Sequence, residues 1–199
     1  MEQGTLTDLF RALHIVAALL MAWPYYALAA VNQRVRLGPP LGDRTDRYME
    51  NILKSRTTGC FVFQFTLLAG GFALIAARVH DGLHDGNWFL TNKVIIAKIV
   101  ILLLMTASLS WVRFVMQPEI DRRFGDYGEL TEEDKNRIML LRVRRKRMSA
   151  GCMFLAFSAA LLGLQTYVRF PYWLTAVLAA LVAVWAWRSY RSTTPYGWV

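Results

Sequence analysis

The chain has 199 residues, of which 55% are hydrophobic and 19% are charged, and its formal net charge at pH 7 is +9. The apolar residues occur in blocks of about twenty, the length that crosses a bilayer, so the composition excludes an ordinary soluble core. The two cysteines, Cys60 and Cys152, have no histidine nearby in the sequence, which excludes a zinc-finger pattern.

Five apolar blocks predict membrane-spanning helices. The first continues past Pro24 into YYALAAV and has no basic leader, so we expect a mature span and not a cleaved signal peptide. No internal repeat interrupts the chain. The sequence therefore predicts one all-α integral membrane domain over residues 1–199, a bundle of five transmembrane helices with spans at about 9–31, 59–79, 93–116, 149–168 and 171–188.

The basic residues gather in alternate loops. Loop 32–58 contains six Lys or Arg and loop 117–148 contains nine, whereas residues 1–8 and 79–92 contain none. The positive-inside rule then places the N-terminus outside and the C-terminus in the cytoplasm, in a multi-pass protein of a bacterial inner membrane. We attribute the basic excess to this orientation and to anionic lipid headgroups, and we expect no nucleic-acid partner.

Helical patterns continue into both basic loops. Residues 43–56 place Tyr48, Ile52 and Leu53 on one stripe, so we expect a helix on the membrane surface that leads into the second span. In the other loop, Thr131 and Asp134 form a capping-box pattern. That pattern predicts a helix that begins near Thr131 and continues into the fourth span.

Small residues within the spans predict where the helices pack together. They include Gly70 and Gly71 in the second span and Gly163 in the fourth. In lipid the hydrophobic effect contributes little to the association of helices. Close packing through small residues therefore contributes much of the stabilisation. We therefore expect these positions inside the bundle, Cys60 and Cys152 as buried, unreactive thiols, and a peripheral fifth span without a buried charge.

Two ionisable residues lie inside predicted spans, His14 in the first and Lys98 in the third. A charge near the bilayer centre costs at least about 3 kcal/mol, so such residues usually face the bundle interior and have a function. Each lies about five residues from the outer end of its span, roughly 7–8 Å deep. His14 could also simply hydrogen-bond to a neighbouring helix, and Lys98 could extend its apolar stem toward the headgroups.

The residues around the depth of His14 and Lys98 favour a heme b. Arg11 lies one turn outward of His14, and Arg78 closes the outer end of the second span, so both could neutralise heme propionates. Neutral imidazole is a common axial ligand of heme iron, and lysine can serve as the free amine. We expect His80 and His84, in a loop rich in Gly and Asp, to be solvated and not to bind metal.

A family resemblance is carried by three segments: RALHIVAALLMAWPYYALAAV, YMENILKSRTTGCFVFQFTLLAGGFAL and WFLTNKVIIAKIVILLLMTASLSWVRFVMQPEI. Together they resemble the group of small membrane proteins that includes the heme-containing bacterial protoporphyrinogen oxidase and the copper-resistance protein D domain. The resemblance covers roughly residues 9–165. It implies that a histidine of the first span and a lysine of the third bind a heme b, here His14 and Lys98, with Lys93 as the competing lysine.

Three functions remain open from the sequence. The first is a heme b-binding membrane redox protein that oxidises a porphyrinogen or passes electrons to a quinone. The second is a non-catalytic integral subunit of a larger respiratory or photosynthetic complex. The third, a transporter or metal-handling protein, fits less well because the chain has no inverted repeat and no methionine or histidine ladder. The residues leave open whether the chain is an enzyme.

Overall fold

The computed structural model describes residues 5–21, 44–125, 130–168 and 171–191, and this part of the chain contains helices and no strand. The all-α prediction is therefore confirmed for the described residues. The helices are α1 (Thr5–Met21), α3 (Arg44–His80), α4 (Trp88–Thr91), α5 (Lys93–Trp111), the π-helical turn η1 (Val112–Met116), α6 (Gln117–Phe124), α7 (Glu132–Val168) and α8 (Tyr172–Arg191).

Four of the described helices are long and apolar enough to cross a membrane: α3, the continuous helix formed by α5, η1 and α6, α7, and α8. They contain the second to fifth predicted spans, so the chain is a multi-pass membrane protein. Of the first predicted span, 9–31, the structure describes residues 9–21, which belong to α1. Residues 22–31 lie outside the described part, and the count of five spans stays a prediction.

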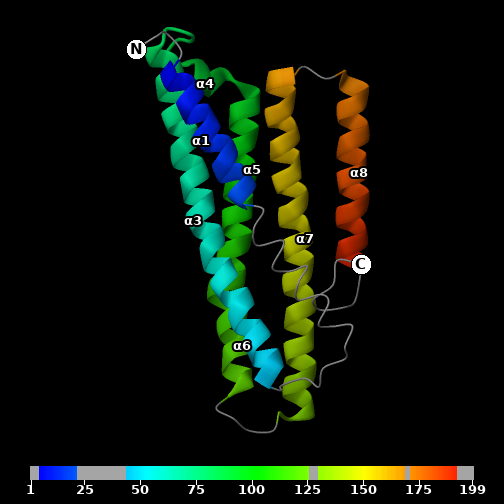
Figure 1. Cartoon of the computed structure of the whole chain (residues 1–199). Coiled ribbons are helices and arrows are strands. Elements are labelled where there is room, and N and C mark those ends of the chain that lie inside the picture. Colours follow the sequence, from blue (N-terminus) through cyan, green and yellow to red (C-terminus); the bar gives the residue numbers. More distant parts are fainter. Residues whose placement is uncertain (1–4, 22–43, 126–129, 169–170, 192–199) are drawn as a thin grey trace.

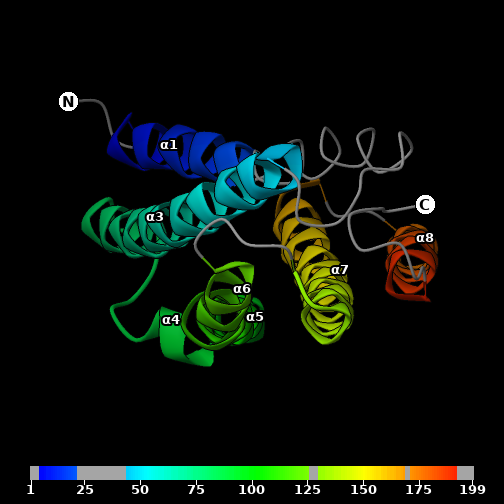
Figure 2. The same ribbon diagram turned by 90° about the horizontal axis from the view of Figure 1, so that it is seen from below.

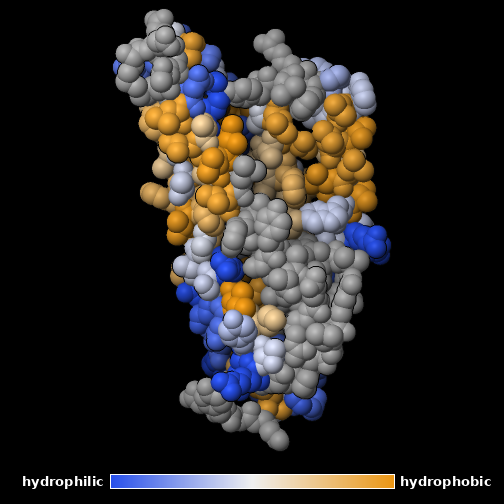
Figure 3. Space-filling model, in the orientation of Figure 1, coloured by the Kyte–Doolittle hydropathy of each residue, from blue (hydrophilic) through white to orange (hydrophobic). Residues whose placement is uncertain are grey.

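The helices run along a common axis, and α1 packs on α3 while α8 packs on α7 (Figures 1 and 2). Both α3 and α7 have 37 residues, which corresponds to about 55 Å and exceeds a hydrocarbon core of about 30 Å. The helices α1 and α8 accompany only one half of this length (Figure 1). That half is apolar on its visible face and the other half is polar (Figure 3), so α3, α6 and α7 form a helical extension beyond the bilayer.

The helix expected at 43–56 is present from Arg44 on and leads into the second span, whereas its location on the membrane surface stays a prediction. These residues, from Arg44 on, are the first part of α3 and continue without a break into the span. Tyr48 is 63% exposed, whereas Asp46, Glu50 and Leu53 are buried. The hydrophobic stripe was misleading because the buried face of this segment carries carboxylates that pair with arginines of α7.

The extension has its own apolar core and a buried ionic cluster. The core consists of Val112, Met116, Ile120, Phe124, Ile138 and Leu141. Arg142 is completely buried and pairs with Asp46 at 3.0 Å and Glu50 at 3.2 Å. Arg145 donates two hydrogen bonds to Glu50, and one of 2.9 Å to the Gln117 side-chain oxygen. Acids and bases from α3 and α7 thus neutralise each other where α6 meets both.

The turn η1 brings Gln117 into this cluster. A π-helical turn inserts an extra residue and so rotates α6 relative to α5. Met116 and Gln117 are buried on this side, and Gln117 also donates a hydrogen bond of 3.0 Å to Glu50. Pro118, the second residue of α6, lies within this continuous helix directly after η1, and its missing N–H removes one backbone hydrogen bond there.

The predicted start of the long helix that leads into the fourth span is confirmed. Helix α7 begins at Glu132 and continues to Val168, without a break before the fourth span. The Thr131 hydroxyl accepts a hydrogen bond of 3.2 Å from the Asp134 N–H and donates one of 2.7 Å to the Asp134 carboxylate. Three acidic residues in the first turn complement the helix dipole.

Candidate functional site

The imidazole of His14 lies between α1 and α3, against two glycines. A Cβ atom at Gly70 would be 3.6 Å from His14 Nδ1, and one at Gly71 would be 3.5 Å from His14 Cε1. The ring is also close to the backbone of Leu67, one turn earlier on α3. Glycine therefore lets the edge of the imidazole approach the α3 backbone, and a larger side chain at either position would push it away.

The ring nitrogen Nδ1 of His14 is buried and forms no well-aligned hydrogen bond with any described residue, although the ring lies near the Leu67 backbone. A buried polar atom without a partner costs about 1–3 kcal/mol, and such atoms are uncommon in folded proteins. An unpaired, buried imidazole nitrogen is therefore a place where a ligand, an ion or a water molecule would add stability. This is the strongest chemical signal in the membrane half of the molecule.

Lys98 lies between α5 and α7 and also rests on a glycine. A Cβ at Gly163 would be 3.2 Å from Lys98 Nζ and 3.8 Å from Cε. The side chain is half-buried, and no carboxylate pairs with it in the described part of the chain. Its amine therefore points across the bundle toward α7, which differs from a lysine extended to the bilayer surface.

His14 and Lys98 lie close enough for their charges to interact, and so do Lys98 and Arg78. This proximity agrees with the prediction that His14 and Lys98 lie at a similar depth in the bilayer. Each side chain nevertheless contacts a different helix, His14 the glycines of α3 and Lys98 the glycine of α7. The competing residue Lys93 is the first residue of α5 and is exposed, so it lies outside this cluster.

The two arginines expected at the rim have different surroundings. Arg11 pairs with Asp8 on its own helix at 2.6 Å. Arg78 lies over the indole of Trp88, with its Cζ atom 5.6 Å from the ring centroid. A propionate could reach the Arg78 guanidinium without displacing a carboxylate, whereas at Arg11 it would compete with Asp8.

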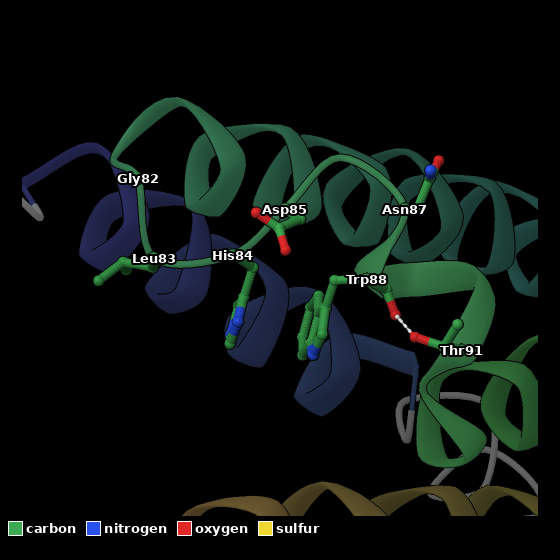
Figure 4. A pocket seen from close by; sticks show the side chains of 7 residues that line it. All are labelled: Gly82, Leu83, His84, Asp85, Asn87, Trp88 and Thr91. Carbon is green, nitrogen blue, oxygen red and sulfur yellow. Dashed lines mark hydrogen bonds between the residues drawn. The ribbon is translucent and has the colours of Figure 1, made fainter.

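The loop beyond Arg78 forms a hollow at the same end of the bundle (Figure 4). The hollow has a volume of about 480 Å³ and is lined by Gly82, Leu83, His84, Asp85, Asn87, Trp88 and Thr91. The rings of His84 and Trp88 stack with centroids 3.8 Å apart, so His84 is held by an aromatic neighbour. His80 is exposed beside Asp81 at 3.4 Å.

The packing of α1 against this end depends on a polar contact. The Thr7 hydroxyl, which is buried, donates a hydrogen bond of 2.6 Å to Asp81 just after α3. On the other side of the loop, the Asn92 side chain accepts hydrogen bonds from the N–H groups of Val94 and Ile95 and caps α5. These two contacts fix where α1, α3 and α5 meet, and hence the level of His14 and Lys98.

The cysteine and carboxylate side chains of the described residues do not form a metal site. The described residues contain no group of three or more His, Cys, Asp or Glu side chains that could hold a metal ion. Cys60 and Cys152 are free thiols and are only partly buried, so the expectation of buried thiols holds in part.

Sequence reasoning found the ionisable residues but missed which neighbours they face. The small-residue pattern placed Gly70, Gly71 and Gly163 inside the bundle without assigning them to His14 and Lys98. The contact of Arg78 with Trp88 was also missed, although an aromatic residue ten positions after a basic one across a short loop could have suggested it. No family model, curated protein or solved structure matches the chain.

Proposed function

We propose that the chain is an integral membrane protein that binds a heme b through His14, with Lys98 as the second axial ligand. The observation that carries the proposal is the buried, unpaired Nδ1 atom of His14 within electrostatic reach of Lys98. Imidazole nitrogen and free amine are both donors that heme iron accepts. His14 on α1 and Lys98 on α5 would hold the iron from two different helices.

The donor set fits a heme better than a bare metal ion. A bare ion needs three or four protein ligands, and the described residues offer no such group. A heme supplies four nitrogens itself and requires only one or two from the protein. The apolar spans around His14 and Lys98 would contact the macrocycle, and Arg78 would bind a propionate.

The chemistry that a heme b supplies is one-electron transfer. In this chain His14 would fix its position and orientation, and Gly70 and Gly71 would leave room for the imidazole edge. The apolar helices would exclude water and so influence the reduction potential. We further propose a membrane redox role, with a porphyrinogen or a quinone as the electron partner.

We also propose five spans, with the predicted block 9–31 as the first, an outward N-terminus and an inner-membrane location. Support comes from the arrangement of the ends. The ends of α3 and α7 and the starts of α5 and α8 lie at one end of the bundle (Figure 1). The polar extension with most of the basic residues lies at the other, as the positive-inside rule requires for the cytoplasm.

A reduced-minus-oxidised absorption spectrum of the protein purified in mild detergent tests the cofactor. A Soret shift and a sharp α-band on reduction are expected. A flat difference spectrum, in protein expressed with a heme precursor supplied, would refute heme binding.

A further inference from the structure

The middle of α7 and the C-terminal end of α8 are joined by a row of arginine and aromatic side chains. The guanidinium of Arg147 lies 5.3 Å from the centroid of the Tyr190 ring, and that of Arg191 lies 5.5 Å from the Trp187 ring. Trp187 and Tyr190 stack with centroids 6.1 Å apart and planes 10° from parallel. We call these four residues the arginine–aromatic row. All four are exposed.

The row lies at the boundary of the apolar half. Arg147 precedes the predicted fourth span by two residues, and Arg191 comes three residues after the fifth. The contact between Arg147 and Tyr190 shows that the two boundaries are level. In Figure 3 the apolar surface gives way to polar surface where α8 ends. Trp and Tyr favour this depth, where the headgroups begin.

No carboxylate of the described residues neutralises the positive charge at the row. The sequence contains no Asp or Glu after Asp134. The exposed Arg144, Arg147, Arg188 and Arg191 form no ion pair with any described residue. The buried arginines of α7 differ, because Arg142 and Arg145 pair with Asp46 and Glu50. The exposed set thus offers positive charge that an anion could neutralise, without displacing a carboxylate of the described residues.

We infer that the row binds an anionic glycerophospholipid from the cytoplasmic leaflet. A planar guanidinium donates two parallel hydrogen bonds to a phosphate, and two such groups flank the stacked rings here. The rings would lie at the glycerol level. Above Trp187 on α8, Val184 and Leu181 are 67% and 61% exposed and provide an apolar track for an acyl chain. A phosphate with acyl chains fits both features, whereas a free phosphate would use only the arginines.

The test is native mass spectrometry of the full chain in mild detergent with equal amounts of phosphatidylglycerol and phosphatidylcholine of the same acyl composition. Wild type should retain phosphatidylglycerol preferentially. The double variant Arg147→Gln/Arg191→Gln should lose that preference, by about fivefold for each arginine removed. The matched control is Arg122→Gln, which removes one exposed arginine from α6 in the polar extension and should leave the preference unchanged.

Three results would overturn the inference. Equal retention of the two lipids by wild type is the first, and it decides the matter even if a variant cannot be recovered folded. An equal loss in Arg122→Gln is the second, because it would indicate a general effect of net charge. Displacement of the lipid by inorganic phosphate at the same concentration is the third, since it would assign the row to a free anion.

Discussion

Glu50 of α3 and Arg145 of α7 form a buried ion pair with two hydrogen bonds, although 95 positions separate them in the chain. Arg142 adds a second contact with Glu50 and one with Asp46. Because these residues lie beyond the apolar half, the pair ties the two longest helices together outside the bilayer. The extension is thus held by charge as well as by its apolar core.

Glu50→Gln should destabilise the protein by about 3–5 kcal/mol, because it leaves the charge of Arg145 buried without its partner. The measurement is the free energy of unfolding of the detergent-solubilised protein, followed by circular dichroism. The control Glu132→Gln removes a carboxylate that is 82% exposed and pairs only with Lys135, so it should cost less than about 1 kcal/mol. Equal losses in both variants would contradict the account of the cluster.

Stability should fall at low pH through Glu50, which lies in the polar part of α3. Burial opposes the charged carboxylate, but attraction and hydrogen bonds from Arg145 and Arg142 outweigh it and lower the pKa of Glu50 from 4.5 to about 2. A lowered pKa stabilises the fold above the unfolded value, so this contribution, about 3 kcal/mol, is present above pH 4.5 and is lost as the pH falls toward 2.

Unfolding free energies measured between pH 7 and pH 2.5 check this dependence. Wild type should lose stability mainly below pH 4.5, whereas Glu50→Gln should show a smaller decrease over the same interval. If the two curves ran parallel, Glu50 would not be the titrating group.

Gly71→Leu should displace the His14 imidazole from α3, because a Cβ atom there would already be in van der Waals contact with Cε1 at 3.5 Å and a leucine side chain extends further. We expect loss of bound heme and weaker packing of α1. The matched control is Gly59→Leu on the same helix, where no atom lies within 4 Å of the new Cβ. The heme-to-protein ratio of the two purified variants is the measurement, and a lower ratio in Gly59→Leu than in Gly71→Leu would contradict the assignment.

Lys98→Met should change the spectrum of bound heme, since it exchanges the amine for a thioether, a different kind of heme ligand, in a side chain of similar length. Lys93→Met is the control, because Lys93 is exposed at the first residue of α5. The positions of the Soret and α-bands report the axial ligands. A spectral change in Lys93→Met, with none in Lys98→Met, would reverse the choice of lysine.

The spans could be predicted because a bilayer demands long apolar runs, and four such runs recur as helices. The helix cap at Thr131 could also be predicted, since it depends on residues only three positions apart. The polar extension could not be predicted from the sequence. Its buried face holds Asp46 and Glu50, and a pattern of hydrophobic residues cannot reveal burial that depends on arginines nearly a hundred positions away.

At the candidate site, too, some features could be predicted from the sequence and others could not. His14 and Lys98 stood out because ionisable residues are rare within spans. Their glycine neighbours could not be assigned, because helix pairing is decided by rotation about each axis, which the sequence alone does not specify. The π-helical turn that directs Gln117 to Glu50 is a further case of rotation that residue types do not encode.

The central claim is that His14 binds heme iron, and the heme-to-protein ratio of His14→Ala tests it most directly, measured as pyridine hemochrome beside wild type and His80→Ala. His80 is the same residue type but is the last residue of α3, and its side chain is 80% exposed. We predict that wild type and His80→Ala retain heme while His14→Ala, folded by circular dichroism, has lost it. Undiminished heme in a folded His14→Ala variant would contradict the account.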